Sequence, residues 1–165
     1  MNVLTLPKLN RALDHVQGEL IDLGFWSEEV AAAEVYLVVA GFAYAWKYDG
    51  GEGCMCFPAV SLSRYAQRFG WPRVTLRDIV RHEYGHVVAD TRGGYRTRAF
   101  TKVFGKAKGS AVDPDRFVSP YAATQPAEDF AETFMHFVRL KGVLPLKWKT
   151  PAIRPKWTFV ESLRA

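Results

Sequence analysis

Two histidines that lie four residues apart, His82 and His86, are the side chains in this sequence best placed to do chemistry together. On an α-helix, residues at this spacing share one face, so both imidazoles can reach a single metal ion. Glu83 follows the first histidine and would lie beside the ion without binding it. Two neutral nitrogen ligands, an open coordination position and a neighbouring carboxylate are what a zinc hydrolase requires. A helix that carries two histidines and no metal is the alternative that the pair alone leaves open.

A catalytic zinc site needs a third protein ligand, and the candidates lie in a segment far downstream. Glu128, Glu132 and His136 follow one another at four-residue spacing, so one helix face can carry all three. We expect Glu128 to be the ligand because it lies in the first turn after Pro126, and Glu132 to accept a hydrogen bond from a ligating histidine. The exchange of these two roles remains an alternative. We expect His136 and the distant His15 to be structural.

With these residues in place, the sequence resembles the gluzincin zinc metallopeptidases, in which the third ligand is a glutamate on a second helix. The resemblance covers roughly residues 63–140 and rests on His82-Glu83-x-x-His86 and on Glu128-Asp129-Phe130-Ala131-Glu132. Asp90, four residues after the second histidine, matches a position that many gluzincins fill with aspartate. The resemblance implies that Asp90 and Glu132 support the ligands from outside.

Among gluzincins, the motifs are most similar to those of the anthrax lethal factor-like catalytic domains and of the minimal gluzincins. In the lethal factor-like domains a tyrosine lies seven residues before the glutamate ligand, and Tyr121 lies seven before Glu128 here. The resemblance implies that the Tyr121 hydroxyl binds the oxyanion that forms during hydrolysis. A tyrosine that only anchors a loop is the alternative.

These residues predict a metalloendopeptidase that holds one zinc ion and takes a peptide or protein as its substrate. Glu83 would act as the general base toward the attacking water. A zinc-binding domain without proteolytic activity, acting as a scaffold or binding module, is the competing hypothesis. The formal net charge of +5 could indicate a nucleic-acid partner, but no RNA-binding or helix-turn-helix motif accompanies it. We therefore expect no nucleic-acid partner.

The length of 165 residues and the apolar content of 48% predict a single domain over residues 1–165. Its core would span about 1–142, followed by a tail over 143–165 of unknown role. Three prolines favour an extended tail, which could lie across the active site. Cys54 and Cys56 are too close for an unstrained disulfide and are expected to be reduced. Without a signal peptide or membrane span, we expect a cytoplasmic monomer with no membrane partner, and non-classical secretion stays open.

The pattern along the chain predicts an α+β fold: a small zincin-like domain with a short mixed sheet and an exposed edge strand. The sheet would pack on the helix that carries the histidine pair, beside a second, ligand-bearing helix. The helices are expected over 9–23, over 63–69, from Thr75 to Gly93-Gly94, and from Pro126 to Gly142. The strands are expected over 33–46 and 54–62, with Pro58 placing the second at the sheet edge. Residues 95–120 are expected to form a long loop anchored by Phe100 and Phe104.

Overall fold

The structure is a computed structural model that describes residues 3–39, 46–49, 52–70, 75–92, 94–105 and 113–164. It has the α+β composition that the sequence predicts. The helices are α1 (Leu6–Asp22), α2 (Glu28–Ala31), α3 (Leu62–Phe69), α4 (Leu76–Thr91), α5 (Arg98–Phe104), α6 (Pro126–Arg139) and α7 (Ile153–Glu161). The strands are β1 (Glu34–Val38), β2 (Trp46–Asp49) and β3 (Glu52–Pro58), and short 3-10 helices are η1 (Gly94–Arg96) and η2 (Leu146–Trp148).

The three strands form a mixed sheet in the order β1-β3-β2. β1 runs parallel to β3, and β2 runs antiparallel to it. The prediction that the run 54–62 forms an edge strand is therefore wrong, because β3 lies at the centre. Pro58 is tolerated there because it is the last residue of β3, while β2 pairs only with Glu52–Met55. The strand predicted over 33–46 ends at Val38, and its residues 40–45 lie outside the described part of the chain.

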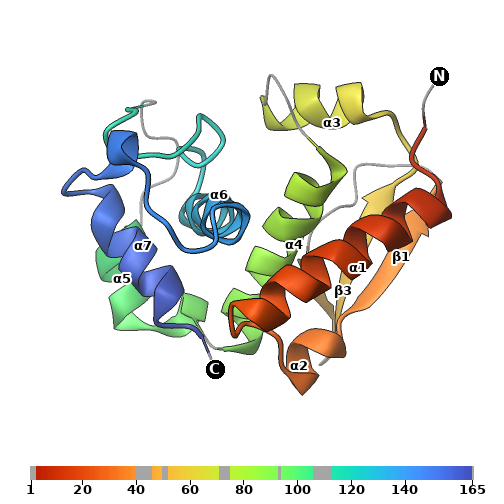
Figure 1. Ribbon diagram of the computed structural model, residues 1–165, viewed down its shortest axis with the longest axis horizontal. Coiled ribbons are helices and arrows are strands. Elements are labelled where there is room, and N and C mark those ends of the chain that lie inside the picture. Colours follow the sequence, from red (N-terminus) through yellow and green to blue (C-terminus); the bar gives the residue numbers. More distant parts are fainter. Residues whose placement is uncertain are drawn as a thin grey trace.

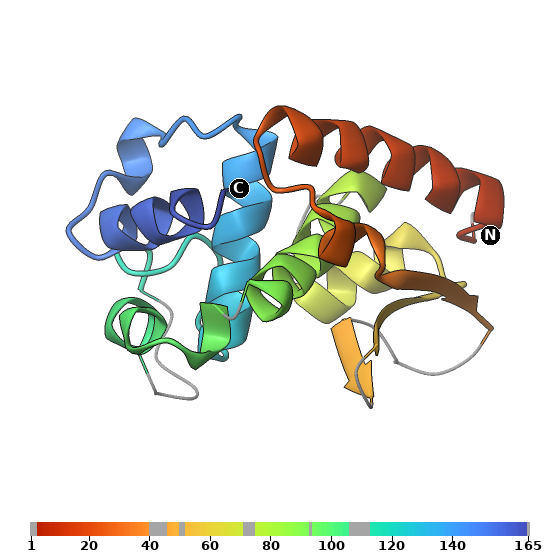
Figure 2. The same cartoon turned by 90° about the horizontal axis from the view of Figure 1, so that it is seen from below.

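Helix α4 lies at the middle of the molecule. In Figures 1 and 2 it is flanked on one side by α1, α2 and the strands, and on the other by α6 with α5 and α7. Every residue of α4 from Asp78 to Ala89 is buried. A helix buried on all sides must give each of its polar side chains a partner. Hydrogen bonds accordingly hold His82, His86 and Asp78 of α4 in place.

Local capping signals set where the two central helices begin. The Thr75 hydroxyl accepts a hydrogen bond from the Asp78 backbone N–H at 3.2 Å, and the Asp78 carboxylate accepts one from the Thr75 N–H at 3.3 Å. This capping box confirms the predicted start of α4. Pro126 occupies the first turn of α6, as predicted. Backbone N–H groups in the first turn have no partner within the helix, so a proline there loses no hydrogen bond. Beyond the end of α6, Gly142 has a φ of +80°, which L side chains rarely adopt.

Helices α4 and α6 cross closely at Gly85. A Cβ atom at this position would lie 3.2 Å from both the Ala131 Cα and the Phe134 Cδ1. We expect Gly85→Leu to lower the free energy of unfolding by about 3 kcal/mol, because the side chain must push the helices apart. Urea denaturation followed by circular dichroism measures this loss. Gly18→Leu on α1, where nothing lies within 4 Å, is the control and should be neutral or slightly stabilising. Equal stability of the two variants would contradict this account of the crossing.

The segment predicted as a long loop contains a helix. Residues 94–96 form η1 and residues 98–104 form α5, so the prediction of a loop over 95–120 is wrong for this part. The Thr97 hydroxyl caps α5 by accepting a hydrogen bond from the Phe100 N–H at 3.0 Å. Phe100 and Phe104 are buried in the aromatic core, which confirms them as anchors. Residues 106–112 lie outside the described part of the chain.

The carboxy-terminal tail is folded rather than extended, which corrects the prediction from its prolines. Pro155 lies in the first turn of α7, where a proline removes no helical hydrogen bond. The Trp157 ring packs on Phe137 of α6 at 5.2 Å between centroids, and its indole N–H donates to the Gly142 carbonyl. The ring of Phe159 contacts Phe130 and other core phenylalanines. These aromatic side chains therefore bind the tail to α6 and α5.

A buried ion pair joins α7 to α6. The Lys156 ammonium donates to Asp129 Oδ2 at 2.6 Å and to the Arg116 carbonyl. Burial raises the pKa of Asp129 to about 6, although Lys156 acts in the opposite direction. We expect Lys156→Met to lower the unfolding free energy at neutral pH by about 3 kcal/mol, since it leaves a buried carboxylate without its counter-charge. Adding Asp129→Asn should recover most of this loss in thermal melts. A Lys156→Met protein as stable as the wild type would contradict the importance of the pair.

Candidate metal centre

The structure brings His82, His86 and Glu128 together. One ligand atom of each lies within 4.8 Å of the others, and within the described residues these three form the candidate metal cluster. The Glu128 Oε2 atom lies 3.1 Å from His82 Nε2 and 3.5 Å from His86 Nε2. The histidines come from successive turns of α4, and Glu128 comes from the first turn of α6. The close crossing of the two helices is what places the carboxylate opposite both rings.

A second carboxylate holds His82 from its other ring nitrogen. Glu132 is fully buried, and its Oε1 lies 2.8 Å from His82 Nδ1. The Ser119 hydroxyl donates to the remaining Glu132 oxygen at 2.5 Å. When His82 Nδ1–H donates to Glu132, the Nε2 lone pair is left for a metal ion. Glu128 therefore faces the Nε2 atoms, whereas Glu132 lies behind the ring.

Tyr95 supports the second histidine. Its hydroxyl lies 2.7 Å from His86 Nδ1, the same ring position that Glu132 occupies on His82. Burial, and then the charges of Glu128 and Asp90, raise the pKa of Tyr95, so the hydroxyl keeps its proton. Neither Tyr95 nor Ser119 was predicted from the sequence, because both lie in segments without a recognisable motif.

Loss of the Tyr95 hydroxyl should weaken metal binding. We expect Tyr95→Phe to reduce zinc affinity about tenfold, because His86 Nδ1 loses the group that orients its ring. Titration against a zinc-binding indicator dye measures the change. Tyr84→Phe is the matched control, because Tyr84 lies on α4 between the two histidines but packs against Trp26. If both variants bind zinc like the wild type, Tyr95 has no role in positioning the ligand.

The carboxylates make this site favourable for a cation. Burial lowers the pKa of His82, but hydrogen bonds to Glu128 and Glu132 outweigh it and raise the pKa to about 10. Burial likewise raises the pKa of Glu128, yet its hydrogen bonds with His82 and His86 bring the pKa well below its usual range. The buried acids thus stabilise positive charge between the rings. The same negative charges would stabilise a divalent cation placed between the rings.

The other predicted site residues lie around this cluster. Glu83 is buried on α4 directly after His82. The Tyr121 ring lies 5.8 Å from the His82 ring, between centroids. Asp90 is partly buried in the last turn of α4, and its charge acts on Tyr95. The structure therefore gathers these side chains near the histidine pair, while the roles assigned to them stay predictions.

The two remaining histidines lie outside the cluster, as predicted. His15 is exposed on α1 and lies 3.3 Å from Glu19. His136 packs against Trp148 at 4.6 Å between ring centroids, and burial lowers its pKa to about 4. Cys54 and Cys56 are both free thiols, as expected.

The donor set fits zinc. Two imidazole nitrogens and one carboxylate oxygen are ligands that zinc accepts, and three protein ligands leave a coordination position open. Both ligand rings have a hydrogen-bond partner on the nitrogen that points away from the cluster, which matches the usual surroundings of metal-binding histidines. The residues present could therefore hold a zinc ion without rearrangement of the helices.

Comparison with known proteins agrees with this chemistry. Residues 60–150 match the model of the family described as "putative zinc-binding metallo-peptidase". Because the match spans more than half of the 165 residues, the chain belongs to this zinc-binding metallopeptidase family. No curated protein and no solved structure matches the chain.

Of the helices in the described ranges, none combines the length and apolar character needed to cross a membrane.

Proposed function

We propose that this protein is a zinc-dependent metalloendopeptidase of the gluzincin type, with a zincin-like fold. The observation that carries the proposal is the convergence of His82 Nε2, His86 Nε2 and the Glu128 carboxylate at the crossing of α4 and α6. Membership of a zinc-binding metallopeptidase family supports both the metal and the class of reaction. The three residues would hold one zinc ion, and Glu132 and Tyr95 would orient the two rings.

The chain's own side chains supply the proton transfers. When bound, zinc would lower the pKa of a water molecule and polarise the carbonyl of the peptide bond to be cut. Glu83 would accept a proton from the attacking water and return it to the leaving amine. Its buried position on α4, directly after His82, supports this role.

Tyr121 would stabilise the charge that develops on the carbonyl oxygen. Its ring lies against His82, on the segment that leads into α6. A hydroxyl donor in such a position contributes roughly 3 kcal/mol to the stability of the transition state. The spacing of seven residues between Tyr121 and Glu128, which resembles that of the lethal factor-like domains, supports the same role.

Incubation of the full chain and zinc with a proteome-derived peptide library tests the proposal. We expect new peptide ends in the mass spectrum, their loss with a chelator, and their return when zinc is restored. Stoichiometric zinc binding without any cleavage would overturn the proposal and favour a zinc-binding scaffold. The monomeric state, the cytoplasmic location and the absence of nucleic-acid and membrane partners stay predictions from the sequence.

A further inference from the structure

A groove of about 860 Å³ is lined in part by the two helices that carry the candidate metal centre. It runs between the amino-terminal segment with α1, the start of α3, the start of α4 and the end of α6. Asp78, in its lining, precedes His82 by one helical turn on α4. Arg139, also in the lining, is on the helix that carries Glu128. The groove therefore shares both helices of the candidate metal centre.

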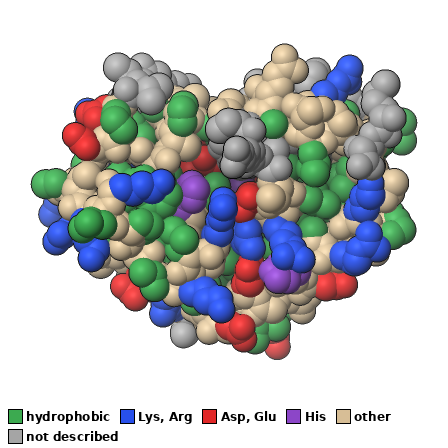
Figure 3. Space-filling view, turned by 45° about the horizontal axis from the view of Figure 1, so that its top comes forward, with side chains coloured by type: hydrophobic (Ala, Val, Ile, Leu, Met, Phe, Trp, Pro, Cys, Tyr) green, Lys and Arg blue, Asp and Glu red, His purple; other side chains and the backbone are tan. Residues whose placement is uncertain are grey.

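The lining of the groove is strongly basic. Its described residues include one carboxylate, Asp78, and five cationic side chains: Lys8, Arg11, Arg77, Arg81 and Arg139. Figure 3 shows Lys and Arg side chains gathered across the middle of one face of the molecule. Arg11 and Arg77 are exposed, and the side chain of Arg139 is 51% exposed. A concave surface with one sign of charge attracts ligands of the opposite sign.

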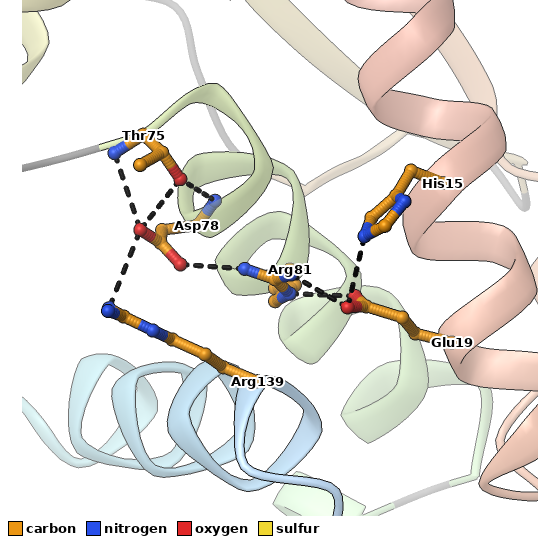
Figure 4. Close-up of polar contacts among 6 residues, drawn as sticks. All are labelled: His15, Glu19, Thr75, Asp78, Arg81 and Arg139. Atoms are coloured by element: carbon orange, nitrogen blue, oxygen red, sulfur yellow. Dashed lines mark hydrogen bonds and ion pairs between the residues drawn. The ribbon is translucent and has the colours of Figure 1, made fainter.

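Arg81 forms ion pairs with two carboxylates at this site. Its guanidinium makes two hydrogen bonds to Glu19, at 2.7 and 2.8 Å, and a third to Asp78 at 2.7 Å. Figure 4 shows this chain of contacts from His15 to Thr75, with Arg139 approaching Asp78 from the other side. The Arg139–Asp78 distance is 3.6 Å, and Asp78 also caps α4. Arg81 and Arg139 together offset the two negative charges of Glu19 and Asp78. The charges of the exposed Arg11 and Arg77 are therefore in excess over the acids of these contacts.

The floor of the groove favours a polypeptide over a nucleic acid. The name floor is given to the five aliphatic residues of the lining: Val3, Leu4, Ala12, Leu62 and Leu76. Among the described residues that line it, none is aromatic, whereas single-stranded nucleic acids are held by stacking of bases on aromatic rings. A lining that combines aliphatic and cationic side chains complements a segment that carries both aliphatic and acidic side chains.

We propose that this groove binds an acidic, leucine-containing segment of a polypeptide partner. The segment's aliphatic side chains would lie on the floor, and its carboxylates would meet Arg11, Arg77 and Arg139. That the partner is a protein substrate, held by this second contact in addition to the metal centre, rests on the proposed function. The binding itself requires no hydrolysis.

Fluorescence anisotropy with a labelled twelve-residue peptide of four Glu-Glu-Leu repeats tests the proposal. The peptide is titrated with the full chain carrying Glu83→Gln, so that cleavage cannot remove it. The test variant adds Arg11→Gln, Arg77→Gln and Arg139→Gln. The matched control adds Lys102→Gln, Lys149→Gln and Arg154→Gln, which remove the same charge from exposed positions away from the groove. Circular dichroism verifies that both variants are folded.

We expect the test variant to bind the peptide about tenfold more weakly, and the control variant to stay within twofold of the parent. Binding should weaken between about 50 and 300 mM salt, as exposed charge pairs are screened. Equal affinities of the two variants would overturn the proposal, as would tighter groove-dependent binding of a twelve-nucleotide single-stranded DNA. If the peptide binds in the groove but the wild-type protein cleaves no library peptide, the proposed function is overturned and this inference stands.

Discussion

Glu83→Gln is expected to lower kcat/KM for peptide hydrolysis about a thousandfold while the zinc content stays that of the wild type. The amide cannot accept the proton of the attacking water, which removes general base catalysis. It has nearly the same shape as the carboxylate, so the buried position beside His82 should keep its packing. The loss therefore reports on chemistry rather than on folding or metal binding.

Two measurements on the same preparation check this expectation. Cleavage of the best library peptide gives kcat/KM, and elemental analysis by mass spectrometry gives the zinc content. Glu161→Gln is the matched control, because its carboxylate is 57% exposed on α7, far along the chain from the cluster. Wild-type turnover in Glu83→Gln would exclude Glu83 as the base. Loss of zinc would instead indicate that Glu83 is needed to form the metal site.

The second large effect is expected at the proposed third ligand. Glu128→Ala should weaken zinc binding about a thousandfold, which corresponds to ~4 kcal/mol, because two histidines alone hold zinc poorly. Glu132→Ala should weaken binding by only about 10–100-fold, because Glu132 acts through the His82 ring. Competition with a chelator of known affinity measures both constants.

The comparison of these two variants distinguishes the ligand from its support. A larger loss for Glu132→Ala than for Glu128→Ala would reverse the assignment and restore the alternative that the sequence leaves open. Equal small losses would mean that the third ligand comes from elsewhere. Thermal melts in the absence of zinc show whether either variant has lost stability for another reason.

The parts of the fold that sequence could predict are those with local causes. The start of α4 follows from Thr75 and Asp78, which satisfy each other's backbone groups within one turn. The start of α6 follows from Pro126, which is suited to a first helical turn. The prediction that the histidine pair and Glu128 form one cluster came from the spacing of the candidate ligands and from the resemblance to the gluzincins.

The parts that sequence could not predict depend on tertiary packing. Pro58 indicated an edge strand, but β3 pairs with both β1 and β2 and lies at the sheet centre. Pro58 is tolerated there because the pairing with β2 ends before it. The prolines of the tail indicated an extended chain, whereas Trp157 and Phe159 gain more by packing on α6 and its neighbours. Tyr95 reaches His86 only because η1 turns the chain back after α4. The residue types in this segment do not indicate that the chain folds back onto α4.

The most direct test of the central claim is an anomalous scattering map, recorded at the zinc absorption edge, of crystals grown with zinc. The account predicts one strong peak at the crossing of α4 and α6, about 2.0–2.2 Å from the Nε2 atoms of His82 and His86 and from a Glu128 oxygen. A fully occupied zinc site elsewhere, or a peak beside the histidines with the Glu128 carboxylate turned away, would contradict it.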